Sequence, residues 1–368
     1  MTISGKIAFY GFRGGKGGIS PVMLNLINEM ADRGVEAAVL LNNPDIPELS
    51  QLQPRVKRVW LGNVQGIKRI FSLAAYIKEE RPDVLLCNRE PANRTAVLAK
   101  KISGTETRLA FRVGMPMERA LKRRNFLKRW LRQSYIRFSY RRSDVVIANA
   151  RGVAEDIALV TGLPLSSIKV VPNPTVGPLL FRKAQEDIDH PWLNDGQPPV
   201  IMGIGRLARQ KDFPTLIRAF SMVRKDMNCR LLILGEGKER PFLQGLIDRL
   251  GLSGSAKLYG FSPNPFALLK KASLFVLSSA WEGLPNVLIE AMALGVPVVA
   301  ADCRSGPSEI LEGGRFGKLV PVGDVEKMAH AMTETLCNPP TKDFLQQAAM
   351  RYDASSCTVE YMKVLRLC

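Results

Sequence analysis

Long apolar runs are missing from this sequence of 368 residues. The longest candidate is interrupted by Glu290, Gly295 and Pro297, so no segment is predicted to cross a bilayer. The first residues, MTISGKIAFYGF, lack the long apolar core of a signal peptide. We therefore expect a protein that is made and kept in the cytoplasm.

Metal-ligating and nucleophilic patterns are also scarce. The sequence has two histidines, His190 and His330, which stand alone, and its six cysteines form no C-x-x-C pair. This argues against a zinc site and indicates reduced thiols. Asp187 and Asp189 form a D-x-D, but prolines surround it and no strand leads into it. We predict no metal, no cofactor and no Ser-His-Asp or Cys-His catalysis.

Cations, by contrast, are in excess, with a formal net charge of +18 that implies a polyanionic partner. Ten further cations follow Arg112 up to and including Arg142, with Glu118 as the only acid in this segment. Aromatic and leucine side chains are interleaved with them, a pattern typical of a helix lying at an anionic membrane surface. The predicted membrane patch comprises Arg123, Arg124, Lys128, Arg129 and Trp130. The alternatives are a solvated helix face whose aromatics pack inward, and a basic nucleic-acid-binding surface.

Apolar runs alternate with helical patterns in both halves, which predicts α/β architecture with two parallel sheets covered on both faces. We expect a Rossmann-like domain over residues 1–172, a linker over 173–198, a second Rossmann-like domain over 199–343, and a C-terminal helix over 344–368 that packs back on the first domain. The proline-rich VPNPTVGP at 171–178 marks the break. A ligand is favoured in a cleft between two such domains. The strands are expected at residues 7–12, 37–41, 56–61, 84–87, 107–113 and 145–148, and then at 199–204, 230–234, 256–259, 274–277 and 298–301.

Two carboxylates interrupt the apolar segment SSAWEGLPNVLIEAMALGVPVVAAD at 278–302. Pro285 suits the first turn of a helix, so a helix is expected from Asn286 to about Gly295, with Glu282 in the loop before it. The free N–H groups at such a helix start suit a phosphate. Glu290, inside the helix, can accept hydrogen bonds from the two hydroxyls of a ribose. The alternative is that both glutamates are structural and ion-paired.

The segment GIGRLARQKDF at 203–213 follows a predicted strand and carries Arg206 and Lys211. Two cations at this edge of a parallel sheet suit a diphosphate, with Gly205 among the binding residues. The same glycines form a weak dinucleotide fingerprint, but no acidic residue follows near position 223, which argues against a nicotinamide dehydrogenase.

A third segment, GFRGGKGGISP at 11–21, is a glycine-rich turn that lets the backbone approach a phosphate or sugar. It is not a P-loop, because Lys16 is followed by Gly17 and not by Ser or Thr.

EGLPNVLIE, together with GRLARQKD, LGEGKE and DCRSGPSEIL, resembles the E-x7-E family-4 glycosyltransferases of the GT-B fold. The resemblance implies transfer of a sugar from a nucleotide-sugar with retention of configuration and without metal. It implies that Arg206 and Lys211 neutralise the departing diphosphate, and that Gly15 approaches it from the first domain. It further assigns the donor sugar and phosphate to Glu282 and the loop after it, and the ribose to Glu290. The implied set is catalytic Arg206, Lys211 and Glu282, with substrate-binding Gly15, Gly205, Gly283, Leu284, Pro285, Asn286 and Glu290.

The sequence departs from many relatives in one place. A histidine that these relatives carry after the strand TRLAFRVGMP is absent, and Arg112, Val113 and Gly114 stand there. Front-face substitution, in which the leaving phosphate takes the acceptor proton, needs no such histidine.

The expected function is transfer from a UDP-sugar, or alternatively from GDP-mannose, to a lipid-linked or lipopolysaccharide acceptor in cell-surface glycan assembly. The enzyme is expected to bind an anionic membrane surface as a peripheral protein on the inner face of the plasma membrane, and not to bind nucleic acid.

Overall fold

The structure, a computed structural model, describes residues 5–12, 19–43, 46–122 and 125–367. Within these ranges the chain forms two compact units. The first contains the residues up to Pro174 together with those from Ala354 onward, and the second contains Thr175–Asp353. The predicted end of the first domain, at residue 172, lies two residues before this division.

The first unit is a parallel seven-stranded sheet in the order β3-β2-β1-β4-β5-β6-β7. Its central strands, such as β4, are buried along their whole length, as expected for a parallel sheet covered on both faces. The strands are β1 (Lys6–Tyr10), β2 (Glu36–Leu41), β3 (Lys57–Trp60), β4 (Val84–Cys87), β5 (Arg108–Val113), β6 (Val145–Ala148) and β7 (Ile168–Val170).

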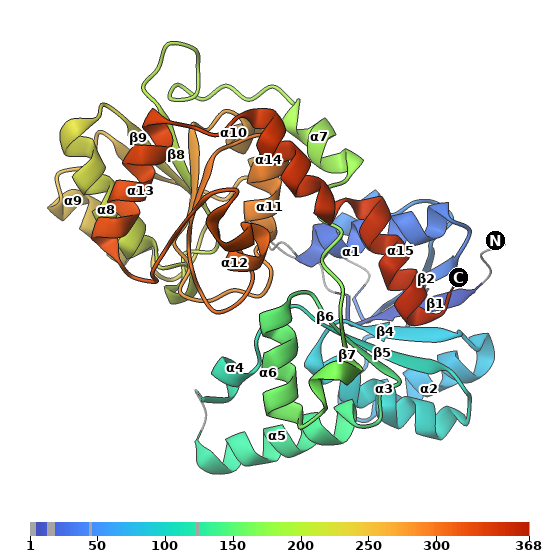
Figure 1. The fold of residues 1–368 in the computed structure, drawn as a ribbon. Helices are drawn as coiled ribbons and strands as arrows, with labels where there is room; N and C mark the ends of the chain where they lie inside the picture. Colours follow the sequence, from blue (N-terminus) through green and yellow to red (C-terminus); the bar gives the residue numbers. More distant parts are fainter. Residues whose placement is uncertain (1–4, 13–18, 44–45, 123–124, 368) are drawn as a thin grey trace. The chain divides into compact units, whose positions relative to one another are not determined.

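Helices cover both faces of this sheet (Figure 1). The pair α1 and α15 packs together on one face, whereas α2, α3 and α5 pack side by side on the other. From β1 to β3 the chain moves across the sheet in one direction, and from β3 to β7 it moves in the other. Because crossovers between parallel strands are right-handed, the helices of these two parts lie on opposite faces. The helices are α1 (Ile19–Asp32), α2 (Lys68–Glu80), α3 (Glu90–Ser103), α4 (Glu118–Lys122), α5 (Phe126–Tyr140), α6 (Arg151–Thr161) and α15 (Ala354–Leu365).

The second unit repeats the plan with six parallel strands in the order β10-β9-β8-β11-β12-β13. The strands are β8 (Val200–Ile204), β9 (Arg230–Leu234), β10 (Ala256–Gly260), β11 (Leu274–Leu277), β12 (Val298–Ala301) and β13 (Lys318–Val320). The helices are α7 (Pro178–Ala184), α8 (Phe213–Asp226), α9 (Arg240–Arg249), α10 (Pro265–Lys270), α11 (Asn286–Ala293), α12 (Pro307–Ile310), α13 (Val325–Cys337) and α14 (Lys342–Ala349).

Two predictions about the segments between the sheets are wrong. The linker expected at 173–198 contains α7, which begins with Pro178 in its first turn and buries Leu180 and Ala184. The single helix expected from 344 to 368 is two helices. The backbone at Tyr352 accepts hydrogen bonds from the N–H groups of Thr175 and Val176, and this pairing is incompatible with a continuing helix. Only α15 belongs to the first unit.

Candidate active site

The predicted site residues follow two neighbouring strands of the second sheet. Strand β8 pairs with β9 on one side and with β11 on the other, so the chain reverses its direction of winding between β8 and β11. Ligands bind outside the carboxyl ends of the strands at such a topological switch point. The loop at 205–212 follows β8 and the loop at 278–285 follows β11, which places both at this point.

Lys211 and Glu282 meet across these loops. The Lys211 Nζ donates to Glu282 Oε1 at 2.6 Å, and the Glu282 side chain is only 6% exposed. Gln210 Nε2 donates to the Trp281 carbonyl at 3.0 Å, and the Ser278 hydroxyl donates to the Lys211 carbonyl at 2.7 Å. The predicted cation and the predicted carboxylate therefore form one buried ion pair, held by hydrogen bonds between the two loops.

Residues Gly283, Leu284 and Pro285 are buried and lead directly into α11. A third loop, after β12, supports them: the Ser305 hydroxyl donates to the Gly283 carbonyl at 3.1 Å. Gly306 packs so closely that a Cβ there would lie 2.3 Å from the Gly283 carbonyl oxygen. Three successive strand ends thus fix the backbone that precedes the helix.

Helix α11 begins at Asn286, as predicted from the sequence, and the Leu288 N–H in its first turn donates to the Pro285 carbonyl at 3.0 Å. The Asn286 side chain accepts from the Thr175 hydroxyl at 3.3 Å. A helix N-terminus attracts an anion, because the macrodipole and the N–H groups of the first turn point the same way.

Glu290 lies one turn further along α11 and is half-buried. Desolvation raises the pKa of Glu290 to about 7, and the positive charge of Lys211 opposes this rise. Lys211 therefore lies within electrostatic reach of both glutamates, which the sequence separates by eight positions. Near neutral pH the Glu290 carboxyl exists in both protonation states, so it can accept or donate a hydrogen bond.

Arg206 and Gly205 open the loop after β8. The Arg206 side chain is exposed, and it makes no hydrogen bond or ion pair with the part of the chain that the structure describes. A Cβ at Gly205 would lie 2.8 Å from Lys211 Cε, so a larger residue there would displace the Lys211 side chain from its present path to Glu282. Gly15 lies outside the described residues.

The comparisons with known proteins agree with this geometry. The family model "Glycosyl transferases group 1" matches residues 184–352, and "Glycosyl transferase 4-like domain" matches residues 17–174. An uncharacterized glycosyltransferase of Methanocaldococcus jannaschii, MJ1059, is 32% identical over 67% of this chain and 62% of its own length. The lipopolysaccharide core biosynthesis glycosyltransferase LpsE of Rhizobium meliloti is 27% identical over 90% of this chain and 89% of its own. The chain is a glycosyltransferase.

Its fold is GT-B, as the sequence predicted. The solved structure of Anabaena Alr3699/HepE in complex with UDP superimposes with a TM-score of 0.78, covering 98% of this chain and 99% of that one at 21% identity. An identity this low establishes the shared fold of this glycosyltransferase and not its substrates.

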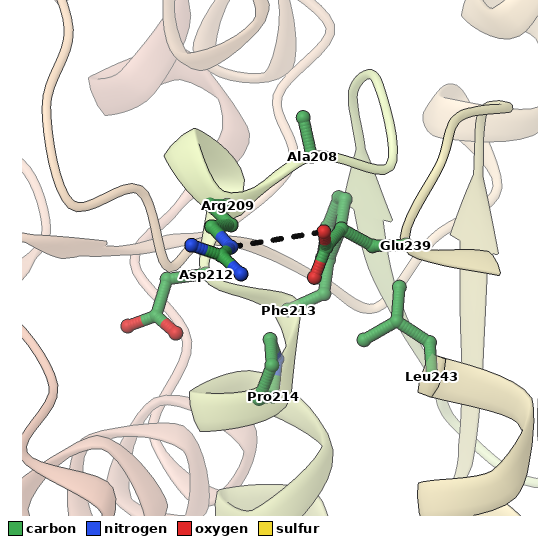
Figure 2. A pocket seen from close by; sticks show the side chains of 7 residues that line it. All are labelled: Ala208, Arg209, Asp212, Phe213, Pro214, Glu239 and Leu243. Atoms are coloured by element: carbon green, nitrogen blue, oxygen red, sulfur yellow. Dashed lines mark ion pairs between the residues drawn. The ribbon is translucent and has the colours of Figure 1, made fainter. Parts of the chain in front are cut away.

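A separate hollow lies beside the loop after β8 (Figure 2). It has a volume of about 180 Å³, and Arg209 faces Glu239 across it, with 3.9 Å between guanidinium and carboxylate. The lining residues are Ala208, Arg209, Asp212, Phe213, Pro214, Glu239 and Leu243. None of the predicted site residues lines this hollow.

The predicted membrane patch lies on and before α5 of the first unit. Phe126 and Trp130 are 84% and 58% exposed, and Lys128 and Arg129 between them are exposed as well. The aromatics at the start of α5 do not pack inward, whereas Tyr140 at its end does. The side chains that α5 buries are Ile136, Ser139 and Tyr140. Arg123 and Arg124 lie outside the described residues.

Several residues that hold the site are not evident from the sequence, among them Gln210 and Ser305. Gln210 lies within the GRLARQKD motif, and a polar residue beside Lys211 was the available signal. Ser305 lies in DCRSGPSEIL, but its contact with Gly283 depends on the adjacency of β11 and β12, which the local pattern does not reveal.

In the described segments no helix is both long and apolar enough to cross a membrane. The same segments hold no group of three or more His, Cys, Asp or Glu residues placed to bind a metal ion. That the enzyme works without metal stays a prediction.

Proposed function

We propose that this glycosyltransferase transfers a sugar from a UDP-sugar to a lipid-linked or lipopolysaccharide acceptor, with retention of configuration and without metal. The observation that carries the proposal is the convergence of Lys211, Glu282 and Glu290 at the switch point of the second sheet, at the N-terminal end of α11. Cations, a helix start and a half-buried carboxylate together match a diphosphate joined to a ribose.

In the proposed reaction the bond between the anomeric carbon and the leaving phosphate oxygen breaks. A bond from the acceptor oxygen forms on the same face of the sugar, and the proton of the acceptor hydroxyl passes to the leaving phosphate. Negative charge on the diphosphate grows during this step. Arg206, whose guanidinium has no partner among the described residues, and Lys211 are the groups that stabilise this charge.

Glu290 and Glu282 have different roles in this proposal. The half-buried Glu290 accepts hydrogen bonds from the ribose hydroxyls, which favours its ionised form once the donor is bound. The buried Glu282 holds Lys211 in place before the donor arrives, and with the backbone of Gly283 and Leu284 it lies where the donor sugar is expected.

UDP is the preferred nucleotide in this proposal because the solved GT-B structure of Alr3699/HepE, which covers nearly the whole chain, was determined in complex with UDP. LpsE, which is similar over most of its length, is described as a lipopolysaccharide core biosynthesis enzyme, and this supports a cell-surface glycan as acceptor. GDP-mannose is the competing donor.

A donor panel tests the proposal. The purified enzyme is incubated with UDP-glucose, UDP-galactose, UDP-N-acetylglucosamine, UDP-N-acetylgalactosamine and GDP-mannose, with and without EDTA, and released nucleotide is measured by mass spectrometry. Arg206→Ala should lose turnover, whereas the matched variant Arg209→Ala should keep it, because Arg209 is an exposed arginine that lines the separate hollow. Release of GDP alone would replace UDP by GDP in the proposal, and turnover abolished by EDTA would contradict metal independence.

We also propose that the enzyme docks on the anionic inner face of the plasma membrane through α5. Exposed Phe126 and Trp130 can enter the headgroup region, while Lys128 and Arg129 meet anionic lipid. Each cation near such a surface contributes about 1 kcal/mol, and this contribution falls off within a Debye length. Lys128→Glu/Arg129→Glu should therefore weaken salt-dependent binding to anionic vesicles. Donor hydrolysis should survive, since neither residue is among those assigned to the donor, which apart from Gly15 belong to the other unit. Tight binding to RNA without binding to vesicles would support the nucleic-acid alternative.

A further inference from the structure

A second group of large apolar side chains is exposed at the start of α2. Trp60, the last residue of β3, is 49% exposed, and Ile67 and Phe71 are 67% and 55% exposed. Ile67 and Phe71 are separated by four residues, about one helical turn, so they lie on the same face of the helix. We call Trp60, Ile67, Phe71 and the exposed Lys68 the α2 patch. Contiguous exposed apolar groups of this kind mark interaction surfaces.

The loop that joins Trp60 to α2 is folded back on the helix. The Arg69 guanidinium donates through Nε to the Val64 carbonyl at 2.6 Å. Gly62 and Gly66 have φ of 86° and 57°, backbone conformations that other residues rarely adopt, and they let the loop turn tightly at both ends. The loop between Trp60 and the first turn of α2 is therefore held against the helix.

Cations flank the α2 patch. No Asp or Glu occurs between Glu48 and Glu79 in the sequence. Arg55 and Lys57 of this segment are ion-paired with Asp32 and Glu36 of neighbouring elements. The cations that remain close to the patch in the sequence are Arg58, Lys68 and Arg69. Apolar side chains flanked by cations match an anionic bilayer, in which the apolar groups enter the interface and the cations meet the headgroups. An aliphatic Ile67 between the two aromatics fits lipid better than it fits the stacked bases of a nucleic acid.

The α2 patch and α5 lie on the same side of the first unit. α2 packs on α3, and α3 packs on α5, all on one face of the sheet (Figure 1). Helix α2 begins after the carboxyl end of β3, and the segment leading to α5 begins after the carboxyl end of β5. Their starts therefore share one edge of the parallel sheet, about 20 Å apart, which is twice the usual distance between packed helices. Between them, the exposed Arg94 of α3 lies over the Tyr135 ring of α5 at 5.2 Å and adds a further cation.

We propose that the α2 patch is a second contact with the anionic membrane, in addition to α5. This inference rests on the membrane docking proposed above and extends it. A single contact leaves the unit free to rotate about it, whereas two contacts set its orientation. They bring the carboxyl edge of the first sheet to the bilayer, where a lipid-linked acceptor exposes its head group. Two linked contacts also multiply each other's affinity.

Co-sedimentation with vesicles tests the second contact. The vesicles contain phosphatidylglycerol and phosphatidylcholine, or phosphatidylcholine alone. Trp60→Ser/Ile67→Ser/Phe71→Ser should lower the partition coefficient on anionic vesicles by about tenfold or more, because three apolar side chains no longer enter the interface. The matched control is Ile102→Ser/Leu159→Ser/Leu165→Ser, which changes three exposed apolar residues at the amino edge of the same sheet. Unchanged binding of the first variant, or an equal loss in the control, would overturn the proposal.

The variant Lys128→Glu/Arg129→Glu separates this proposal from the one on which it rests. If both variants lose binding and their fold losses multiply when combined, both contacts stand. If only the α5 variant loses binding, the α2 patch is overturned and the α5 docking stands. If only the α2 variant loses binding, the α5 docking fails and the α2 contact stands. If neither loses binding, both fail.

A second measurement needs only a conservative change. Brominated phosphatidylcholine in the anionic vesicles should quench tryptophan fluorescence, and Trp60→Phe should remove a share of that quenching, whereas the control Trp192→Phe in the other unit should not. Equal quenching in Trp60→Phe and the unchanged enzyme would contradict insertion of Trp60. A triple variant that changes from dimer to monomer in sedimentation, with unchanged lipid binding, would identify the patch as an interface between copies and overturn the membrane assignment.

Discussion

The buried ion pair between Lys211 and Glu282 gives the sharpest prediction about stability. Glu282 is 6% exposed, and its Oε1 lies 2.6 Å from the Lys211 Nζ. The other side-chain donor to this carboxylate, Gln210 Nε2, is 3.4 Å from Oε2 and is a weak substitute. Lys211→Ala therefore leaves an ionised carboxylate buried without a cation.

Removing one partner of a buried pair costs about 3–5 kcal/mol. In a unit of this size each kcal/mol lowers Tm by roughly 2–4 °C, so the loss should be about 6–20 °C in the transition of the second unit. Differential scanning calorimetry of the single variant and the unchanged enzyme measures this loss.

The double variant Lys211→Met/Glu282→Gln serves as the control. It removes both charges and should recover most of the lost stability, because replacing both members of a buried pair is far less costly than removing one. Its donor turnover should stay low, since the cation assigned to the diphosphate is gone. A single variant with the Tm of the unchanged enzyme, or a double variant as unstable as the single one, would refute the reasoning.

Three further predictions concern the same site. Arg206→Ala should lower turnover about a hundredfold or more, because this side chain is assigned to the charge that develops on the diphosphate. Its Tm should change little, because the side chain is exposed. Equal turnover of the variant and the unchanged enzyme in steady-state kinetics would remove Arg206 from the mechanism. Folding raises the pKa of Glu290 from its ordinary value of 4.5 to about 7. The free energy of unfolding of the unchanged enzyme should therefore fall by up to about 3 kcal/mol, relative to that of Glu290→Gln, as the pH rises from 4.5 to 7. Urea unfolding at both pH values measures this, and parallel pH profiles would contradict the raised pKa. Gly306→Ala should weaken UDP binding in calorimetric titration and destabilise the fold. The φ of Gly306 is +90°, and the new Cβ would lie 2.3 Å from the Gly283 carbonyl oxygen and 2.5 Å from Pro285 Cδ. Unchanged affinity for UDP would show that the Gly283 loop does not hold the donor.

The sequence predicts the longer elements well because continuous apolar runs and helix starts carry local signals. It misses β7 and β13, which are three residues long, and of which only Ile168 and Val320 are buried. It misses the break between α14 and α15 because that break depends on backbone pairing with Thr175 and Val176, far away in the chain.

In the candidate site, too, the local pattern predicts some features and misses those that depend on strand order. The positions of Lys211, Glu282 and Glu290 after strands or near a helix start follow from the local pattern. Their meeting depends on β8 and β11 being neighbours, which is a property of strand order. The sequence left open whether the aromatics of α5 pack inward, because its cations and aromatics alternate without a clear period. In the structure Phe126 and Trp130 are exposed and Tyr140 is buried.

A crystal structure of the enzyme with UDP would show where the donor binds. The diphosphate should lie at the start of α11, within hydrogen-bond reach of the Lys211 Nζ and the Arg206 guanidinium, with the ribose hydroxyls on Glu290. UDP bound instead in the hollow between Arg209 and Glu239, or at any place away from Lys211 and Glu290, would contradict this placement of the donor.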